Sequence, residues 1–155
     1  MEMVFKVDEI DIKIISALLE NGRLPARKLA EQIGVHPNTL LQRLKRLEGQ
    51  GVIKKYAAYV DFAQLGYDLH VIVLMEVRRG HAGDAEQLND LLKIKEIEAL
   101  YATTGMWDLV AIVRVKNRMN LLEVIQKIGN NKIVTKTITQ IVVFPYKSPY
   151  EFNPL

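Results

Sequence analysis

The chain has 155 residues, of which 49% are apolar and 25% charged, and its formal net charge is +3. This composition is typical of a globular protein and excludes an intrinsically disordered chain. The length fits one compact domain or two small ones. There is no cysteine, which excludes disulfides, thiolate metal sites and a cysteine nucleophile.

The first residues include acidic side chains and no apolar run of signal-peptide length. No later stretch reaches about 18 uncharged apolar residues, the length that a membrane-spanning helix needs. We therefore expect a protein that is neither exported nor membrane-spanning. Because the lack of cysteine suits a reducing compartment, the cytoplasm is the expected location.

The first helix is predicted over residues 8–20. Asp8 is a suitable N-cap with Asp11 three residues later, and isoleucine and leucine then recur at helical spacing. The run stops at Asn21-Gly22. A helix with these signals at both ends is expected to form early in the chain.

Two more helices are predicted over residues 25–32 and 36–49, separated by Gly34. The third helix carries an apolar stripe at i, i+4 and i+7, made by Leu40, Leu44 and Leu47. Three helices, the last two joined by a glycine turn, form a helix-turn-helix pattern. Residues 52–59 are predicted to be a strand, and 61–68 a turn or hinge.

From residue 69 the apolar pattern changes to that of strands. Strands are predicted over residues 69–77, 97–103, 108–115 and 133–144, and helices over 83–93 and 118–128. The order βαββαβ predicts a ferredoxin-like domain, a four-stranded antiparallel sheet with both helices on one face. The fold class is therefore α+β.

The predicted strands are apolar on both faces. In the third strand Leu109, Ala111 and Val113 alternate with Val110 and Ile112. The helices cover only one face, and the chain has no further segment for the other. The simplest cover is the same sheet of another copy, so we expect a homodimer through these sheets.

The polar face of the third helix is the candidate reading surface. It carries Asn38, Thr39, Gln42, Arg43 and Arg46. Asn, Gln and Arg match base edges in the major groove, whereas Lys and Thr suit phosphates. Arg43 is the first choice for a base contact.

Residues 34–56 contain five basic side chains and one acid, which favours an anionic partner for this helix. In this interpretation Lys45 and Lys54 contact phosphates, and His36 caps the helix or contacts a phosphate. The alternative is that the polar face is simply solvated, as on many amphipathic helices. The helix-turn-helix context favours double-stranded DNA.

Neither an enzyme nor a metal site is indicated. His36, His70 and His81 are too scattered for a metal or catalytic centre, and there is no Ser/His/Asp grouping or phosphate-binding loop. No catalytic residue, metal or cofactor is expected. RNA-recognition modules share the βαββαβ order, but residues 108–113 offer no aromatic ring for base stacking.

Several short motifs follow one another along the chain, at residues 7–11, 22–23, 29–30, 43–48, 51–53, 65–67, 104–109 and 137–142. In their order and spacing they resemble the Lrp/AsnC family of prokaryotic transcriptional regulators. The similarity spans nearly the whole chain. It implies a winged helix-turn-helix with three helices and short strands, followed by a RAM- or ACT-like ferredoxin domain, in dimers that assemble further into tetramers or octamers.

The resemblance also implies an amino-acid effector bound between subunits, near the turn at residues 103–108. The implied effector-binding residues are Thr103, Thr104, Gly105, Met106, Trp107, Asp108, Thr137 and Thr139. Gly105 leaves backbone N–H groups accessible to a carboxylate, and Asp108 suits an α-ammonium. The alternative is a tight turn in which Gly105 supplies an unusual φ and Asp108 accepts backbone hydrogen bonds.

The expected organisation is a DNA-binding domain over residues 1–60, a hinge over 61–68 and a dimerisation and effector domain over 69–155. The expected function is a DNA-binding transcriptional regulator that an amino acid modulates. The main alternative is an amino-acid sensor whose N-terminal helices dock on another protein. The operator, the effector and the choice between activation and repression stay open.

Overall fold

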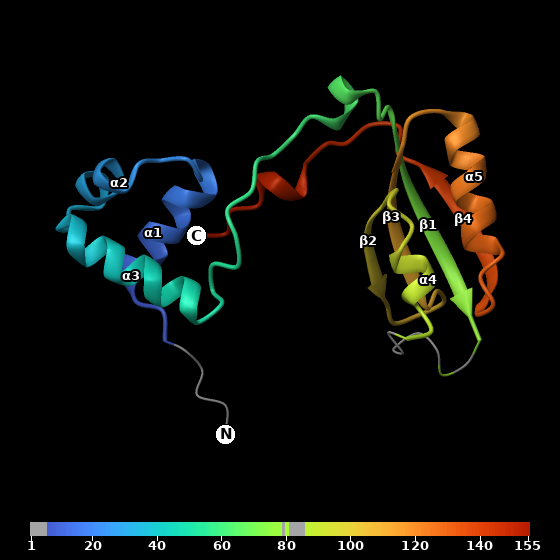
Figure 1. Ribbon diagram of the computed structural model, residues 1–155, viewed down its shortest axis with the longest axis horizontal. Helices are drawn as coiled ribbons and strands as arrows, with labels where there is room; N and C mark the ends of the chain where they lie inside the picture. Colours follow the sequence, from blue (N-terminus) through green and yellow to red (C-terminus); the bar gives the residue numbers. More distant parts are fainter. Residues whose placement is uncertain (1–5, 79, 81–85) are drawn as a thin grey trace. The chain divides into compact units, whose positions relative to one another are not determined.

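The computed structural model describes residues 6–78, 80 and 86–155 and divides into two compact units (Figure 1). The helical unit runs to Tyr59 and includes Lys147–Leu155, and the sheet unit is Val60–Tyr146. Each unit has its own hydrophobic core. In the part of the chain that the structure describes, no helix has the length and apolar character needed to cross a membrane.

The helical unit contains the three predicted helices. They are α1 (Glu9–Glu20), α2 (Ala26–Ile33) and α3 (Pro37–Gly49). Asp8 caps α1 in a capping box with Asp11, as the sequence predicted. Gly34 ends α2 at φ +78°, a left-handed conformation that favours glycine. The helices enclose a small core centred on the fully buried Ile14, Leu40 and Leu47.

The strand predicted over residues 52–59 is wrong. Among the described residues of the helical unit there is no other strand to pair with it, and a lone strand leaves its backbone groups without a ladder. The Tyr56 hydroxyl instead donates to Glu48 Oε1 of α3 over 2.8 Å. Burial, together with this hydrogen bond, raises the pKa of Tyr56 to about 12. The short strands of a wing are thus missing, whereas the helix-turn-helix itself is confirmed.

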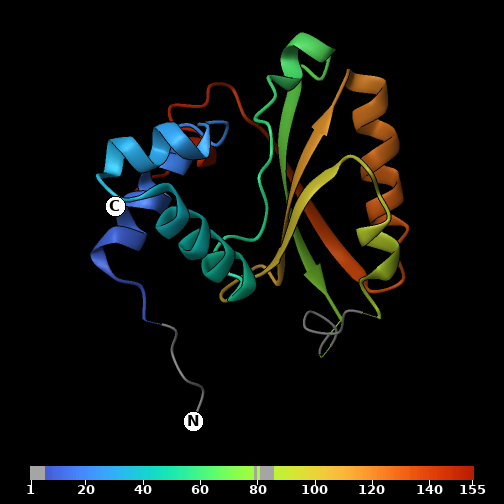
Figure 2. The same ribbon diagram turned by 60° about the vertical axis from the view of Figure 1, so that its left-hand side comes forward.

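The sheet unit has the predicted βαββαβ order. Its elements are β1 (Leu69–Val77), α4 (Asn89–Leu92), β2 (Ile97–Ala102), β3 (Leu109–Val115), α5 (Arg118–Gly129) and β4 (Val134–Ile141). The strands pair antiparallel in the order β2-β3-β1-β4. Both helices lie on the same side of the sheet (Figure 2). The α+β, ferredoxin-like fold class is confirmed.

Two predicted elements of the sheet unit differ from the structure by more than one residue at a boundary. Of the helix predicted over residues 83–93, only four residues form α4, and residues 83–85, like His81, lie outside the described residues. The last strand ends at Ile141 and not at Phe144. The N–H of Val142 donates to the carbonyl of His70 over 2.8 Å. Because β1 begins at Leu69, β4 has almost no further β1 residue to pair with beyond this point.

The two faces of the sheet differ in burial. On the helix-covered face, alternate residues of β1 and β3 such as Val71, Met75 and Val113 are fully buried. On the opposite face Ile72 lies beside Ile112 in the register and is only partly buried. The alternation predicted from the sequence is therefore present, with one face closed and one face open within this chain.

Candidate functional site

The polar side chains of α3 form two stripes. Asn38, Gln42 and Lys45 follow one another at i, i+4 and i+7, and all three are exposed. They lie opposite the fully buried Leu40 and Leu47, which anchor α3 in the core. This first stripe presents two carboxamide groups and one ammonium group to the solvent.

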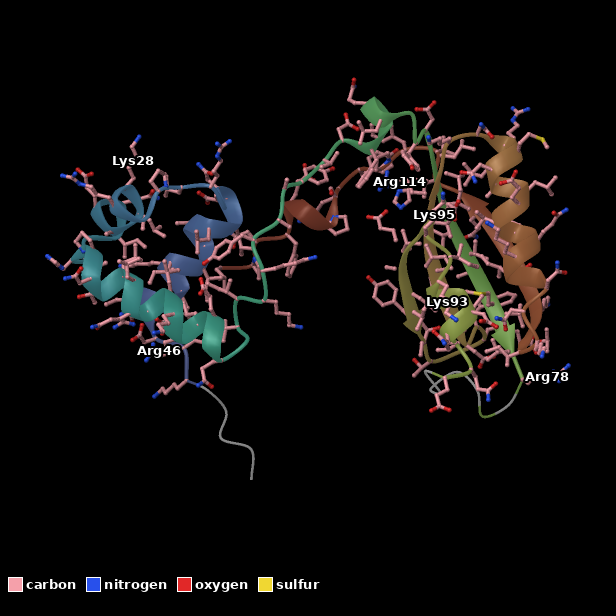
Figure 3. All side chains as sticks on the ribbon, viewed as in Figure 1. Lys28, Arg46, Arg78, Lys93, Lys95 and Arg114 are labelled. Atoms are coloured by element: carbon pink, nitrogen blue, oxygen red, sulfur yellow. The ribbon has the colours of Figure 1, made fainter. Side chains whose placement is uncertain are left out.

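The second stripe has the same spacing and consists of Thr39, Arg43 and Arg46. Arg43 Nη1 donates to both carboxylate oxygens of Asp8, at 2.8 and 2.7 Å, and to Asp11 Oδ1 at 2.9 Å. Arg46, labelled on α3 in Figure 3, donates from Nη2 to Asp11 Oδ2 over 2.6 Å. Both arginines are thus tied to the start of α1.

The sequence predicted Asp11 as a capping partner of Asp8 but not its ion pairs with both arginines. Its side chain has no exposed surface, and it lies three residues before the core residue Ile14 on the buried side of α1. A carboxylate in such a position needs a cationic partner, because an unpaired buried charge is strongly unfavourable. That placement was the signal in the sequence that pointed to an arginine partner on another helix.

The ion pair between Asp8 and Arg43 shifts the pKa of both groups. The hydrogen bond from Arg43, assisted by the N–H of Asp11, lowers the pKa of Asp8 from 3.8 to about 2. In turn the hydrogen bonds to Asp8 and Asp11 raise the pKa of Arg43. Asp8 and Arg43 are therefore both charged at neutral pH, and with Asp11 and Arg46 they form an electrostatic clamp between α1 and α3.

The other predicted DNA contacts lie at the two ends of α3. His36 is the N-cap, and its Nδ1 accepts a hydrogen bond from the N–H of Asn38 over 3.2 Å. Lys54 is exposed in the segment that follows α3. The capping role predicted for His36 is confirmed, and the DNA contacts of all eight residues stay predictions.

The turn between β2 and β3 brings together the six predicted effector residues Thr103 to Asp108. Thr103 Oγ1 donates to the Trp107 carbonyl over 2.6 Å, and the Thr103 N–H donates to the Asp108 carbonyl over 2.9 Å. Gly105 has φ +113°. Asp108 Oδ2 accepts from the N–H of Val77 over 2.8 Å. The tight-turn role anticipated for Gly105 and Asp108 is present.

The tip of this turn is open to the solvent. Met106 is 83% exposed, and the Lys136 ammonium lies 5.4 Å from the centre of the Trp107 ring. That distance is within the range of a cation–π interaction. The turn therefore combines accessible backbone with an indole, an ammonium and a carboxylate.

Thr137 and Thr139 are not on the side of β4 that carries Lys136. In the register Thr137 pairs with Met75 and Thr139 with Val73, whereas Lys136 pairs with Glu76. Met75 and Val73 belong to the helix-covered face, so the two threonines lie on that face. Within one chain they do not join the turn residues in a single site.

Two domain models match the chain. The model of the AsnC-type helix-turn-helix domain matches residues 7–48, and the model of the Lrp/AsnC ligand binding domain matches residues 70–152. These ranges correspond to the three helices of the helical unit and to most of the sheet unit.

Characterised relatives are similar over most of their length. The HTH-type transcriptional regulator FL11 of Pyrococcus furiosus is 36% identical over 94% of this chain and 95% of that protein. The leucine-responsive regulatory protein of Haemophilus influenzae is 36% identical over 70% of this chain and 66% of that protein.

Solved structures agree with the sequence matches. AsnC of E. coli superposes with a TM-score of 0.84 at 29% identity, covering 93% of this chain and 97% of that one. A transcriptional regulator from Neisseria meningitidis in complex with L-Met gives a TM-score of 0.86 at 25% identity, covering 92% and 94%. With its helix-turn-helix, its ferredoxin-like domain and these relatives, the chain belongs to the Lrp/AsnC family of DNA-binding transcriptional regulators.

Proposed function

We propose that this regulator reads double-stranded DNA with the first stripe of α3, pairs through its open sheet face and responds to an amino acid in the cytoplasm. The exposed row of Asn38, Gln42 and Lys45 carries the proposal. A helix-turn-helix places its second helix in the major groove, where a solvated face of this kind meets the base edges.

The residue types assign the contacts. Asn38 and Gln42 have the paired donor and acceptor that match the adenine edge, and Lys45 and Lys54 suit phosphates. Thr39 and the cap residue His36 stand beside the first stripe, within reach of the backbone of the same groove. Arg46 donates to Asp11 and has 45% of its side chain exposed, so it stands at the edge of the proposed DNA-binding surface.

The experiment compares binding to a selected operator with binding to random DNA. Gln42→Ala is expected to lower operator affinity by about 1–3 kcal/mol and leave random binding nearly unchanged. Lys45→Gln is expected to weaken both equally and to reduce the salt dependence by about one phosphate contact. Equal losses on both DNAs for Gln42→Ala would remove the base-reading role.

The open sheet face supports pairing of two copies. Ile72, Leu74, Val110 and Ile112 lie on this face and are only partly buried, and Ile138 of β4 is 40% exposed. The same face carries His70, whose Nε2 has no hydrogen-bond partner among the described residues and whose pKa is lowered by burial. A matching sheet from a second copy would cover this apolar area, with tetramers or octamers built from such dimers.

The turn between β2 and β3 supports an amino-acid effector, the ligand class named for the L-Met complex of the Neisseria relative. In this proposal the effector carboxylate meets backbone N–H groups around Gly105, and its ammonium group meets Asp108. The apolar side chains of Met106 and Trp107 favour an apolar amino acid. Thr137 and Thr139 lie on the helix-covered face and do not join the turn of their own chain. In this proposal they would contact an effector held by the turn of a neighbouring copy.

The test is the thermal unfolding of the protein with each amino acid in turn. A ligand present at about 100 times its Kd stabilises the folded state by about 2.7 kcal/mol. Asp108→Asn keeps an oxygen for the Val77 N–H but loses the charge, and is expected to abolish the shift in unfolding temperature that the amino acid causes. The control Asp90→Asn changes an exposed carboxylate of α4, and should leave the shift intact. Equal shifts in both variants would place the ligand elsewhere.

A further inference from the structure

We infer that Asp8 competes with DNA for Arg43, so that Arg43 is a reserve phosphate contact released only when its ion pair with Asp8 opens. The inference rests on the proposed function in one respect, that α3 is the helix lying on DNA. It assigns a regulatory task to an acidic residue of α1 that faces the recognition helix.

The geometry occupies Arg43 before DNA arrives. One of its two terminal nitrogens, Nη1, contacts three carboxylate oxygens at 2.7–2.9 Å. Arginine reads guanine, or grips a phosphate, with two parallel N–H donors of its planar fork. Since Nη1 is committed to the carboxylates, an end-on contact with DNA through Nη1 and Nη2 requires Nη1 to leave Asp8.

Asp8 and Asp11 differ in how easily each can release Arg43. Asp11 is fully buried and is shared between Arg43 and Arg46, so it belongs to the structural centre of the clamp. Asp8 has 48% of its side chain exposed, and Arg43 has 21% exposed. The Asp8–Arg43 contact therefore lies at the solvent edge, where an incoming anion can replace the carboxylate.

A DNA phosphate is the natural replacement. It offers the guanidinium the same kind of paired oxygens as a carboxylate and carries the same sign of charge. Arg43 lies one turn from the exposed Thr39 and next to the exposed Gln42, so the released side chain would act close to the first stripe. Held by Asp8, the same arginine contributes little to the attraction for random DNA.

The chain offers a clean substitution and a matched control. Asp8→Asn removes the charge but keeps a preferred N-cap residue for α1. Asp8→Ser gives a second uncharged cap if the first variant folds poorly. Glu9→Gln removes one negative charge from the adjacent, exposed position of the same turn, so it reproduces the change in net charge without touching Arg43.

The experiment measures affinity for a random DNA duplex against salt concentration. For Asp8→Asn we expect tighter binding by several-fold at low salt, and a log–log salt slope steeper by about 0.9, the value of one phosphate contact. Glu9→Gln should keep the wild-type slope. Adding Arg43→Gln to Asp8→Asn should return the slope to the wild-type value, whereas Arg43→Gln alone should leave it unchanged.

Three results would overturn the inference. They are an unchanged slope in both Asp8 variants, an equal steepening in Glu9→Gln, and a slope that falls by about 0.9 in Arg43→Gln alone. The last result is the one expected if Arg43 already contacts DNA in the wild type. If Lys45→Gln also leaves the slope unchanged, α3 does not lie on DNA and the proposed function fails; if Lys45→Gln flattens it, only the role of Asp8 fails.

Discussion

The helical unit and the sheet unit deal with polar groups in opposite ways. The helical unit has a small core and places a charged clamp of Asp8, Asp11, Arg43 and Arg46 beside it. The sheet unit satisfies its backbone with strand ladders and buries mainly apolar side chains such as Val73, with Glu96 as its one buried acid among the described residues, but leaves one apolar face open. In the proposed function the first unit therefore acts by binding an anion, DNA, whereas the open face of the second is covered by another copy.

The largest expected effect comes from disrupting the proposed dimer interface on the open face of the sheet. Ile112→Asp would place an unpaired carboxylate in the interface of the proposed dimer, at a cost of about 3 kcal/mol for each of the two copies. Light scattering should then show monomers, and operator affinity should collapse with loss of the paired helices. Leu122→Asp, at an exposed leucine of α5, is the control. A dimeric Ile112→Asp protein would contradict the assignment of this face.

The next effect concerns the centre of the clamp in the helical unit. Asp11→Ala removes the one carboxylate shared by both arginines and should lower the free energy of unfolding by about 3 kcal/mol. Denaturant unfolding followed by helical circular dichroism measures it. Glu9→Ala, at an exposed position, should change the same free energy by less than about 0.5 kcal/mol. Similar losses in both variants would mean that the ion pairs add nothing to stability.

A smaller effect is expected at the turn of the sheet unit. A side chain at Gly105 would meet no atom within 4 Å, but φ +113° is a conformation that other residues rarely adopt. Gly105→Ala should therefore cost about 1–2 kcal/mol of stability through the backbone alone. Thermal unfolding measures this, and Gly129→Ala, in the last turn of α5, is the control. No loss at Gly105 would show that the turn relaxes freely.

The smallest effect is a pH dependence at Asp8. Its pKa is about 2 in the folded chain against 3.8 for the free side chain. A lowered pKa stabilises the fold above the unfolded value, and this contribution is lost as the pH falls. The stability difference between wild type and Asp8→Asn should be constant above pH about 5 and shrink between about 4 and 2. A difference that stays constant down to pH 2 would contradict the ion pair.

The sequence predicted what depends on local spacing. Leucines at i, i+4 and i+7 and the caps at Asp8 and His36 located the helices, and alternation located β1 from Leu69 to Val77. It failed where an element depends on a partner distant in the chain. The segment after α3 had strand-like residues but no strand to pair with among the described residues of the helical unit.

The candidate site shows the same division between local features, which the sequence predicted, and pairings with distant residues, which it did not. Residue types located the polar face of α3, because exposure follows from helical spacing. They did not show that Arg43 turns toward Asp8, a residue 35 positions earlier, since such pairing depends on how α1 packs on α3. Only the buried position of Asp11 carried a hint of it. Thr137 and Thr139 were grouped with the turn by family resemblance, and strand register separates them from it.

Base reading by α3 is tested by selecting bound duplexes from a random DNA library with wild type and with Gln42→Ala. Wild type is expected to enrich a pseudo-palindrome with half-sites about one helical turn apart. Gln42→Ala is expected to lose the preference at one position in each half-site. No enriched sequence, or an identical one for both proteins, would contradict the claim that α3 reads DNA with its first stripe.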